Sequence, residues 1–170
     1  PPPRWGPLRS ALFQLAQGLA ALHAAGKLHR DLKPSNVLVT REGRVVILDF
    51  GLVTELSTGS IDQSGSHIAG TPAYMAPEQA RRGTLSPACD WYAVGVMLYE
   101  ALTGRRPFEG GALEVIVQKQ RDRPPPPSAL ADGIPGDLDA LCAELLRPEP
   151  GERPPAHEVL RRLSPDGEAE

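Results

Sequence analysis

The chain has 170 residues, with 18 Lys and Arg against 21 Asp and Glu, and a formal net charge of −3. This length suits one domain with a sizeable core and is too short for two ordinary domains. The charge balance argues against broad binding to nucleic acid or to a membrane surface, and a composition that is 41% hydrophobic and 23% charged is that of a globular protein.

The chain opens with Pro1–Pro3 and no methionine, so we expect a segment of a larger protein. No apolar run has the length needed to cross a bilayer, and no signal peptide opens the chain. We therefore expect a cytoplasmic segment without direct membrane contact, and leave open an anchor elsewhere in a longer parent. The two cysteines, Cys89 and Cys142, lack a metal-like spacing, which favours buried reduced thiols.

The first predicted element is a helix over residues 8–25. Leucines recur every three or four residues between Leu8 and Leu22, which is typical of one buried helix face. Gly26 follows, and glycine can end a helix in the left-handed conformation.

A β-hairpin is predicted next, with short strands at residues 37–39 and 45–48 around a turn that contains Gly43. The hairpin connects Asn36 directly to Asp49. We therefore expect it to bring these two polar side chains into one site.

The rest of the chain is predicted to be helical around one long loop. Residues 52–70 are rich in Ser, Thr and Gly, and a loop of this length in a compact domain is usually functional. Pro87 can begin a helix over residues 88–102, which is apolar on all sides and should form the buried centre. Three shorter helices are predicted at residues 113–119, 137–147 and 155–163. A proline-rich surface connection is predicted at residues 121–128.

The residues that carry chemistry lie on both sides of the hairpin. Residues 29–36 read H-R-D-L-K-P-S-N, and residues 49–51 read D-F-G. The acids, the lysine and the carboxamide are spaced as phosphoryl transfer from a magnesium–nucleotide complex requires. Asp31 is the candidate that accepts the proton of a substrate hydroxyl, and Lys33 can offset charge that develops on the phosphate.

Asn36 and Asp49 are the candidate magnesium ligands, because magnesium prefers hard oxygen ligands and keeps several waters. Taken singly, Asn36 would be interpreted as a side chain that bonds its own backbone in a turn. Asp49 alone would be interpreted as a cap at a strand end. The joint spacing favours the magnesium interpretation for both.

These runs fit the patterns H-R-D-L-x-x-x-N and D-F-G, and together with Ala76-Pro77-Glu78 they make the chain resemble the eukaryotic-type serine/threonine protein kinases. The resemblance implies a mainly α fold with a short β-hairpin, the carboxyl-terminal lobe of the kinase domain. It would cover residues 1–164, with a polar tail or the start of a linker at 165–170. The implied activity is transfer of the γ-phosphate of ATP to Ser or Thr hydroxyls of protein substrates in signalling, with ATP and Mg²⁺.

The resemblance also implies roles for single residues around the site. Thr71 is similar to the threonine that contacts Asp31 and Lys33 beside the substrate. Leu38 matches the apolar residue under the adenine ring, although a strand residue that faces the core fits it equally well. The implied nucleotide-binding set is Lys33, Ser35, Asn36, Leu38 and Asp49. Supporting roles are implied for six others: packing for His29 and Phe50, phosphate pairing for Arg30, backbone holding for Asp90, and a buried ion pair between Glu78 and Arg153.

The family's amino-terminal lobe has no counterpart in this sequence, which contains no G-x-G-x-x-G loop and no V-A-I-K-like run. We expect that lobe upstream of Pro1, and we expect the chain alone to be inactive or nearly so. Phosphorylation by the chain alone that Asp31→Asn abolishes would contradict this. The alternative function is a non-catalytic kinase-like lobe that acts as a protein-interaction module. A small-molecule kinase is disfavoured by residues 76–78 and by Thr71.

Overall fold

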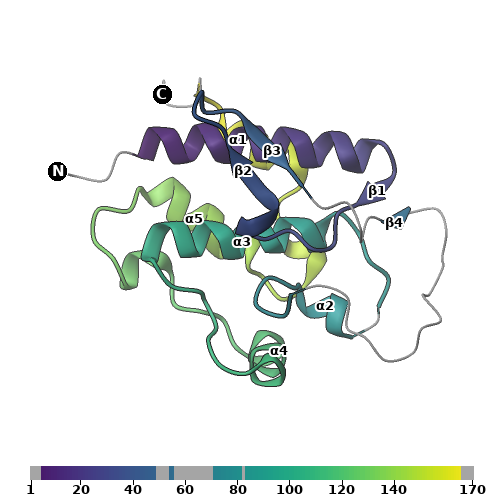
Figure 1. Ribbon diagram of the computed structural model, residues 1–170. Helices are drawn as coiled ribbons and strands as arrows, with labels where there is room; N and C mark the ends of the chain where they lie inside the picture. Colours follow the sequence, from purple (N-terminus) through teal and green to yellow (C-terminus); the bar gives the residue numbers. More distant parts are fainter. Residues whose placement is uncertain (1–4, 49–53, 56–70, 82, 166–170) are drawn as a thin grey trace.

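A computed structural model of the chain describes residues 5–48, 54–55, 71–81 and 83–165. It is mostly helical, with two small antiparallel strand pairs, as the sequence predicts in outline. In chain order the helices and strands are α1 (Trp5–Ala24), β1 (Lys27–Leu28), β2 (Val37–Val39), β3 (Val45–Ile47), β4 (Thr54–Glu55), α2 (Pro77–Ala80), α3 (Ala88–Thr103), α4 (Ala112–Arg121), α5 (Gly136–Leu145) and α6 (Ala156–Leu163). Figure 1 shows α1 and α3 as two long helices, one above the other. The β2–β3 hairpin lies beside α1, and α4 lies at the end of the molecule that is farthest from α1.

Helix α1 confirms the predicted leucine face. Leu12, Leu15 and Leu19 are buried, and the helix packs against α6 and β3. The chain leaves the helix through Gly26, whose φ of 74° is a left-handed conformation that glycine adopts without a steric penalty.

Helix α3 is the buried centre of the fold, as its apolar sequence predicts. It packs against α5, and Gly95 lies where the two helices meet. A Cβ atom at Gly95 would lie 2.8 Å from Cβ of Leu145, so the helices can approach this closely only because the position has no side chain. The buried free thiols of Cys89 and Cys142 also confirm their prediction.

The β2–β3 hairpin pairs Val37 with Ile47 and Val39 with Val45. The ladder is extended by one hydrogen bond in which the Leu48 N–H donates to the Asn36 carbonyl oxygen at 2.7 Å. The hairpin therefore fixes the chain directly after Asn36 and directly before residue 49.

Three elements were not predicted, and each is very short. Strands β1 and β4 have two residues each and pair with one another across a long stretch of chain. Helix α2 has four residues, too few for a periodic pattern. Among the described helices, none combines the length and the apolar character needed to span a membrane.

Candidate active site

Asp90, in the first turn of α3, holds the backbone of the loop that carries residues 29–36. One carboxylate oxygen of Asp90 accepts the backbone N–H of His29, and the other accepts that of Arg30, both at 2.9 Å. The Asp90 side chain is buried, so these bonds are not exchanged with water. The predicted backbone-holding role of Asp90 is confirmed.

His23 completes the coordination of Asp90 and was not predicted. Its Nε2 atom donates to Asp90 Oδ2 at 2.8 Å from the last turn of α1, and its ring lies edge-on to Trp91. Sequence gives only a weak signal for this contact, a histidine in a last helical turn. The result is that α1, α3 and the loop meet at one carboxylate.

Arg30 adopts a left-handed backbone conformation, with φ of 71°. A non-glycine residue in this region is strained, and such strain persists only where the surroundings impose it. Asp90 fixes the Arg30 N–H, and the side chain of Gln79 in α2 donates to the Arg30 carbonyl oxygen at 3.1 Å. The same Gln79 side chain accepts the Ala76 N–H, so α2 and the loop are tied together.

Packing inside the loop is provided by the fully buried His29 ring. Its Nε2 atom donates to the Leu48 carbonyl oxygen at 2.9 Å, and its Nδ1 atom accepts the Asp31 N–H at 3.3 Å. The ring thus has the position of an internal support. Phe50, its predicted packing partner, lies outside the described residues.

Asp31, Lys33 and Thr71 come together although Thr71 lies about 40 residues away in the sequence. Asp31 Oδ1 accepts the Thr71 N–H at 3.1 Å and the Thr71 hydroxyl at 3.2 Å. Lys33 Nζ donates to the Thr71 hydroxyl oxygen at 2.9 Å and lies 3.4 Å from Asp31 Oδ2. The side chain of Asp31 is 12% exposed, so the carboxylate is held at the surface and can be reached.

Asn36 lies beside this group and is buried. Its amide nitrogen donates to the Asp31 carbonyl oxygen at 2.8 Å, which leaves the side-chain oxygen as the atom available to a cation. Asp49, the other predicted magnesium ligand, lies outside the described residues. Within the described residues there is no cluster of three or more His, Cys, Asp or Glu that could hold a metal.

Leu38 and Ser35 both face solvent. Leu38 is 52% exposed in the middle of β2, and its neighbour Val39 is 57% exposed. The alternative in which Leu38 faces the core is therefore wrong. Ser35 is exposed in the 3-10 turn at Pro34–Asn36, without a hydrogen-bond partner among the described residues.

The predicted ion pair between Glu78 and Arg153 is confirmed and is bidentate. The two carboxylate oxygens accept from the guanidinium at 2.6 and 2.9 Å, and both side chains are largely buried. The remaining donors of Arg153 reach the carbonyl oxygens of Ala88, Arg147 and Pro148. All five N–H donors are thus satisfied, which a buried guanidinium requires.

A second buried cation, Lys119 in α4, was not predicted. Its Nζ atom donates to the carbonyl oxygens of Pro72, Ala73 and Met75 at 2.7–2.8 Å. Burial, and to a lesser degree the charge of Arg106, lowers the pKa of Lys119 to about 7 by disfavouring the charged form. The three carbonyl oxygens oppose this shift, because only the protonated ammonium has a donor for each of them. The signal available in the sequence is that Lys119 stands four residues after Val115, on the face of α4 that is buried.

Tyr74 anchors the same stretch to α3. Its hydroxyl donates to Glu100 Oε2 at 2.7 Å. Burial, followed by the hydrogen bond to Glu100, raises the pKa of Tyr74 to about 12. We call residues 71–76 the 71–76 loop. It is fastened to three parts of the fold, through Asp31, Glu100 and Lys119.

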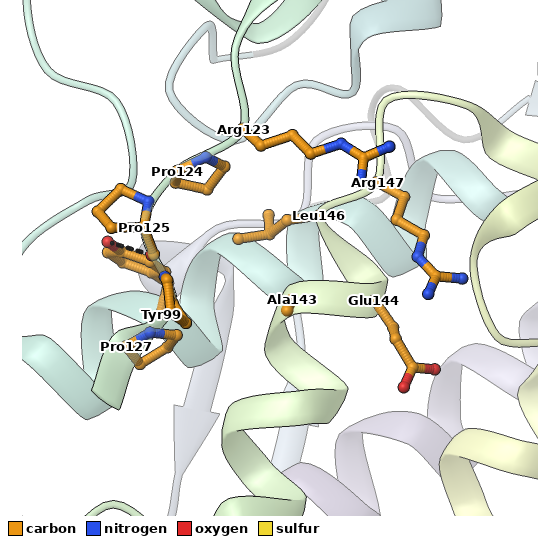
Figure 2. A pocket seen from close by; sticks show the side chains of 10 residues that line it. Tyr99, Arg123, Pro124, Pro125, Pro127, Ala143, Glu144, Leu146 and Arg147 are labelled. Atoms are coloured by element: carbon orange, nitrogen blue, oxygen red, sulfur yellow. Dashed lines mark hydrogen bonds between the residues drawn. The ribbon is translucent and has the colours of Figure 1, made fainter. Parts of the chain in front are cut away.

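Among the pockets in the described part of the chain, two have volumes of about 180 Å³. One adjoins the site, between Thr71, Pro72 and Ala73 on one side and the start of α4 on the other. The other, in Figure 2, lies between the proline run that follows α4 and the end of α5, and the Tyr99 hydroxyl donates to the Pro125 carbonyl oxygen at its edge. None of the predicted catalytic residues lines this second pocket.

Comparison with known proteins points to one family. The sequence profile of the family described as protein kinase domain matches residues 6–163. The serine/threonine-protein kinase PknL of Mycobacterium tuberculosis is 45% identical over 137 residues, which is 80% of this chain and 34% of that protein. PknA of the same organism is 43% identical over 142 residues, 82% of this chain and 31% of that protein. PkaA of Streptomyces coelicolor is 40% identical over 163 residues, 92% of this chain and 29% of that protein. The chain thus spans about a third of the length of the curated relatives that it matches.

Proposed function

The chain belongs to the eukaryotic-type serine/threonine protein kinase family, and from this premise we propose that it forms the catalytic and substrate-facing part of an ATP-dependent kinase for Ser and Thr side chains. The observation that carries the proposal is the contact of the Thr71 hydroxyl with both the Asp31 carboxylate and the Lys33 ammonium. A proton acceptor and a cation are thereby held at one point on the surface.

Asp31 is the proposed proton acceptor. Its Oδ1 atom is occupied by Thr71, and Oδ2 is the oxygen that can approach a substrate hydroxyl. In the reaction a bond forms between that hydroxyl oxygen and the γ-phosphorus, the bond from the γ-phosphorus to the bridging oxygen breaks, and the proton passes to Asp31. ADP is the leaving group.

Lys33 is the proposed electrostatic partner of the transferred phosphoryl group. Its ammonium lies 3.4 Å from Asp31 Oδ2 and is partly exposed, so it can contact an anion that reaches Asp31. Because such a cation is already in place before the reaction, it stabilises developing negative charge without reorganisation.

Magnesium would be held by Asn36 and Asp49, with the phosphates of ATP supplying further oxygens. The available side-chain oxygen of Asn36 fits this interpretation, because a hard cation selects oxygen donors. When bound, the ion neutralises phosphate charge.

The nucleotide base would lie over β2. Leu38 presents its apolar side chain to solvent there, and a flat apolar base is a suitable occupant. Val39, the next residue of the strand, points to the opposite face. Ser35 and Lys33 would lie toward the phosphates. We propose that the upper wall of this site comes from residues outside this chain in the parent protein, and that the site acts in the cytoplasm on protein substrates.

The alternative is a non-catalytic interaction module, and the exposed pair Leu38 and Val39 would suit it as well. The hydrogen-bonded group of Asp31, Lys33 and Thr71 favours the enzyme, because a module that only docks partners does not require it.

The test is transfer of radiolabelled phosphate from ATP to a Ser/Thr-containing protein by the complete protein that carries this chain. Asp31→Asn should lower the rate by about 10²–10⁴-fold, the usual contribution of a positioned general base. Asp132→Asn is the matched control, because Asp132 is exposed and its side chain makes no hydrogen bond or ion pair among the described residues. Undiminished transfer by D31N would contradict the proposed role of Asp31, and an inactive wild-type protein would favour the interaction module.

A further inference from the structure

Lys119 is a buried lysine whose ammonium group, among the described residues, forms hydrogen bonds with backbone carbonyls and lies over an aromatic ring. It is 2% exposed. Each of its three N–H donors reaches a different carbonyl oxygen of the 71–76 loop, at 2.8, 2.7 and 2.8 Å. Nζ also lies 5.3 Å from the centre of the Tyr92 ring in α3. In the described part of the chain, no carboxylate lies within 4 Å of Nζ.

A buried ammonium without an acid is costly, so its surroundings must offset the desolvation. Here three carbonyl dipoles and the face of an aromatic ring provide that compensation. An apolar side chain would avoid the desolvation of a charge but would leave the three carbonyl oxygens without this donor. The cation is therefore suited to a task that an apolar residue cannot perform, which is to hold three backbone carbonyls at one point.

Those carbonyls belong to the loop that begins at the catalytic group. Thr71 contacts Asp31 and Lys33, and the next residues, Pro72 and Ala73, are bound by Lys119. One continuous set of contacts thus leads from Asp31 through the 71–76 loop to α4. The loop is fixed at both ends of this set, at Asp31 and at Lys119.

The pocket beside the site has its two walls on these same pieces. Thr71, Pro72 and Ala73 form one wall, and Gly110, Ala112 and Val115 lie on the other, with Arg106 at the side. Lys119 follows Val115 by one helical turn and joins the two walls by its hydrogen bonds to Pro72 and Ala73. A change at Lys119 would alter the spacing of the walls without touching the residues assigned to ATP.

We propose that Lys119 is a positioning residue for the protein substrate: it fixes the 71–76 loop against α4, and so sets the surface on which the polypeptide next to the phosphorylated hydroxyl lies. This inference rests on the proposed function, since it concerns the substrate side of that same site. Lys119 itself touches neither ATP nor the reacting atoms. Its effect is expected in the affinity for the protein substrate.

The experiment measures steady-state kinetics of the complete protein with a Ser/Thr peptide, together with its ATP hydrolysis in the absence of peptide. Lys119→Met should raise the peptide KM by about 10–100-fold, the range for a misplaced substrate-positioning element. The KM for ATP and the rate of ATP hydrolysis should stay within about twofold of wild type. Lys119→Arg, which keeps a cation with several donors, should give a peptide KM between the two.

Tyr99→Phe is the matched control, because it removes one hydrogen bond to a carbonyl on the segment that follows α4 and leaves the 71–76 loop untouched. Its peptide KM should equal that of wild type. Thermal unfolding shows whether K119M is folded at the assay temperature. If K119M is not folded, Lys119→Gln, which keeps two donors, takes its place with the same expected direction.

The outcomes separate the two proposals. An active wild-type protein whose K119M variant keeps its peptide KM, or loses affinity for ATP and peptide alike, would overturn the role of Lys119 and leave the kinase function standing. A wild-type protein that transfers no phosphate to any peptide would overturn the proposed function, and the role of Lys119 with it. A selective rise in peptide KM supports both.

Discussion

Two buried cations, Arg153 and Lys119, hold neighbouring parts of the same stretch of chain in different ways. Both lie over the ring of Tyr92, at 4.9 and 5.3 Å from its centre. Arg153 binds Glu78 of α2 as a bidentate ion pair and satisfies its other donors with carbonyls. Lys119 binds three carbonyls of the 71–76 loop and, among the described residues, no acid. The difference indicates that Arg153 holds α2 by an ion pair, whereas Lys119 holds the 71–76 loop by hydrogen bonds to neutral carbonyl oxygens.

The largest effect is expected from breaking the ion pair. Arg153→Met leaves the Glu78 carboxylate buried without its partner, and removal of one member of a buried pair costs about 3–5 kcal/mol. Urea unfolding should show this loss in the free energy of unfolding. The double variant Glu78→Leu with Arg153→Met should recover much of it. A loss equal to that of K119M would break the distinction between the two cations.

A smaller effect is expected from Lys119→Met, because it leaves no buried charge behind. Three carbonyl oxygens lose their donor, and buried acceptors left unsatisfied lower the free energy of unfolding by about 1–3 kcal/mol. Part of this loss is offset, because the substitution also removes a buried ammonium and its desolvation cost. The same urea experiment measures it. A loss larger than that of R153M would mean that the carbonyl cluster, and not the ion pair, is the stronger anchor.

Tyr99→Phe sharpens the comparison with a single neutral hydrogen bond. It removes the contact with the Pro125 carbonyl oxygen and should lower the free energy of unfolding by about 0.5–1.5 kcal/mol. Figure 2 shows that this contact lies at the edge of the pocket between the proline run after α4 and the end of α5. If Y99F matched K119M in stability, the three bonds of Lys119 would be worth no more than one.

The smallest effect is expected at an exposed ion pair on α6. Hydrogen bonds from Arg161, and then from Arg162, lower the pKa of Glu158 to about 2, below its ordinary 4.5. A lowered carboxyl pKa stabilises the fold above pH 4.5, and this contribution disappears as the pH falls toward 2. The difference in melting temperature between wild type and Glu158→Gln should therefore shrink over this range. A difference that stays constant from pH 5 to pH 2 would contradict the assignment.

Much of the fold could be predicted because its helices bury regular apolar faces. Local sequence patterns were enough to predict two helices and one helix end. These patterns are the leucines of α1, the apolar run of α3 and Gly26 after α1. Strands β1 and β4 could not be predicted, because a two-residue strand is too short for an alternating pattern and is defined only by its pairing with the other strand. Asp31 was identified from the spacing of the acids, the lysine and the carboxamide in residues 29–49, and Thr71 through resemblance to a family. The structure adds that the two residues touch.

Lys119 and His23 escaped prediction for a physical reason. The partners of Lys119 are backbone carbonyls, which every residue has, so the sequence of the 71–76 loop does not mark them. His23 binds an aspartate 67 residues away, a contact that depends on the packing of α1 against α3. The predicted magnesium ligand Asp49 lies outside the described residues and stays a prediction.

The central claim is that Lys119 holds the 71–76 loop independently of the ion pair between Arg153 and Glu78. Amide hydrogen exchange tests this claim most directly. The N–H groups of Tyr74 and Met75 donate to the Thr71 carbonyl oxygen inside the loop. In K119M these two amides should exchange about tenfold faster or more, as expected when local opening becomes easier by about 1.4 kcal/mol, while the amides of α3 keep their protection. Unchanged exchange at Tyr74 and Met75, or equal acceleration throughout α3, would contradict the claim.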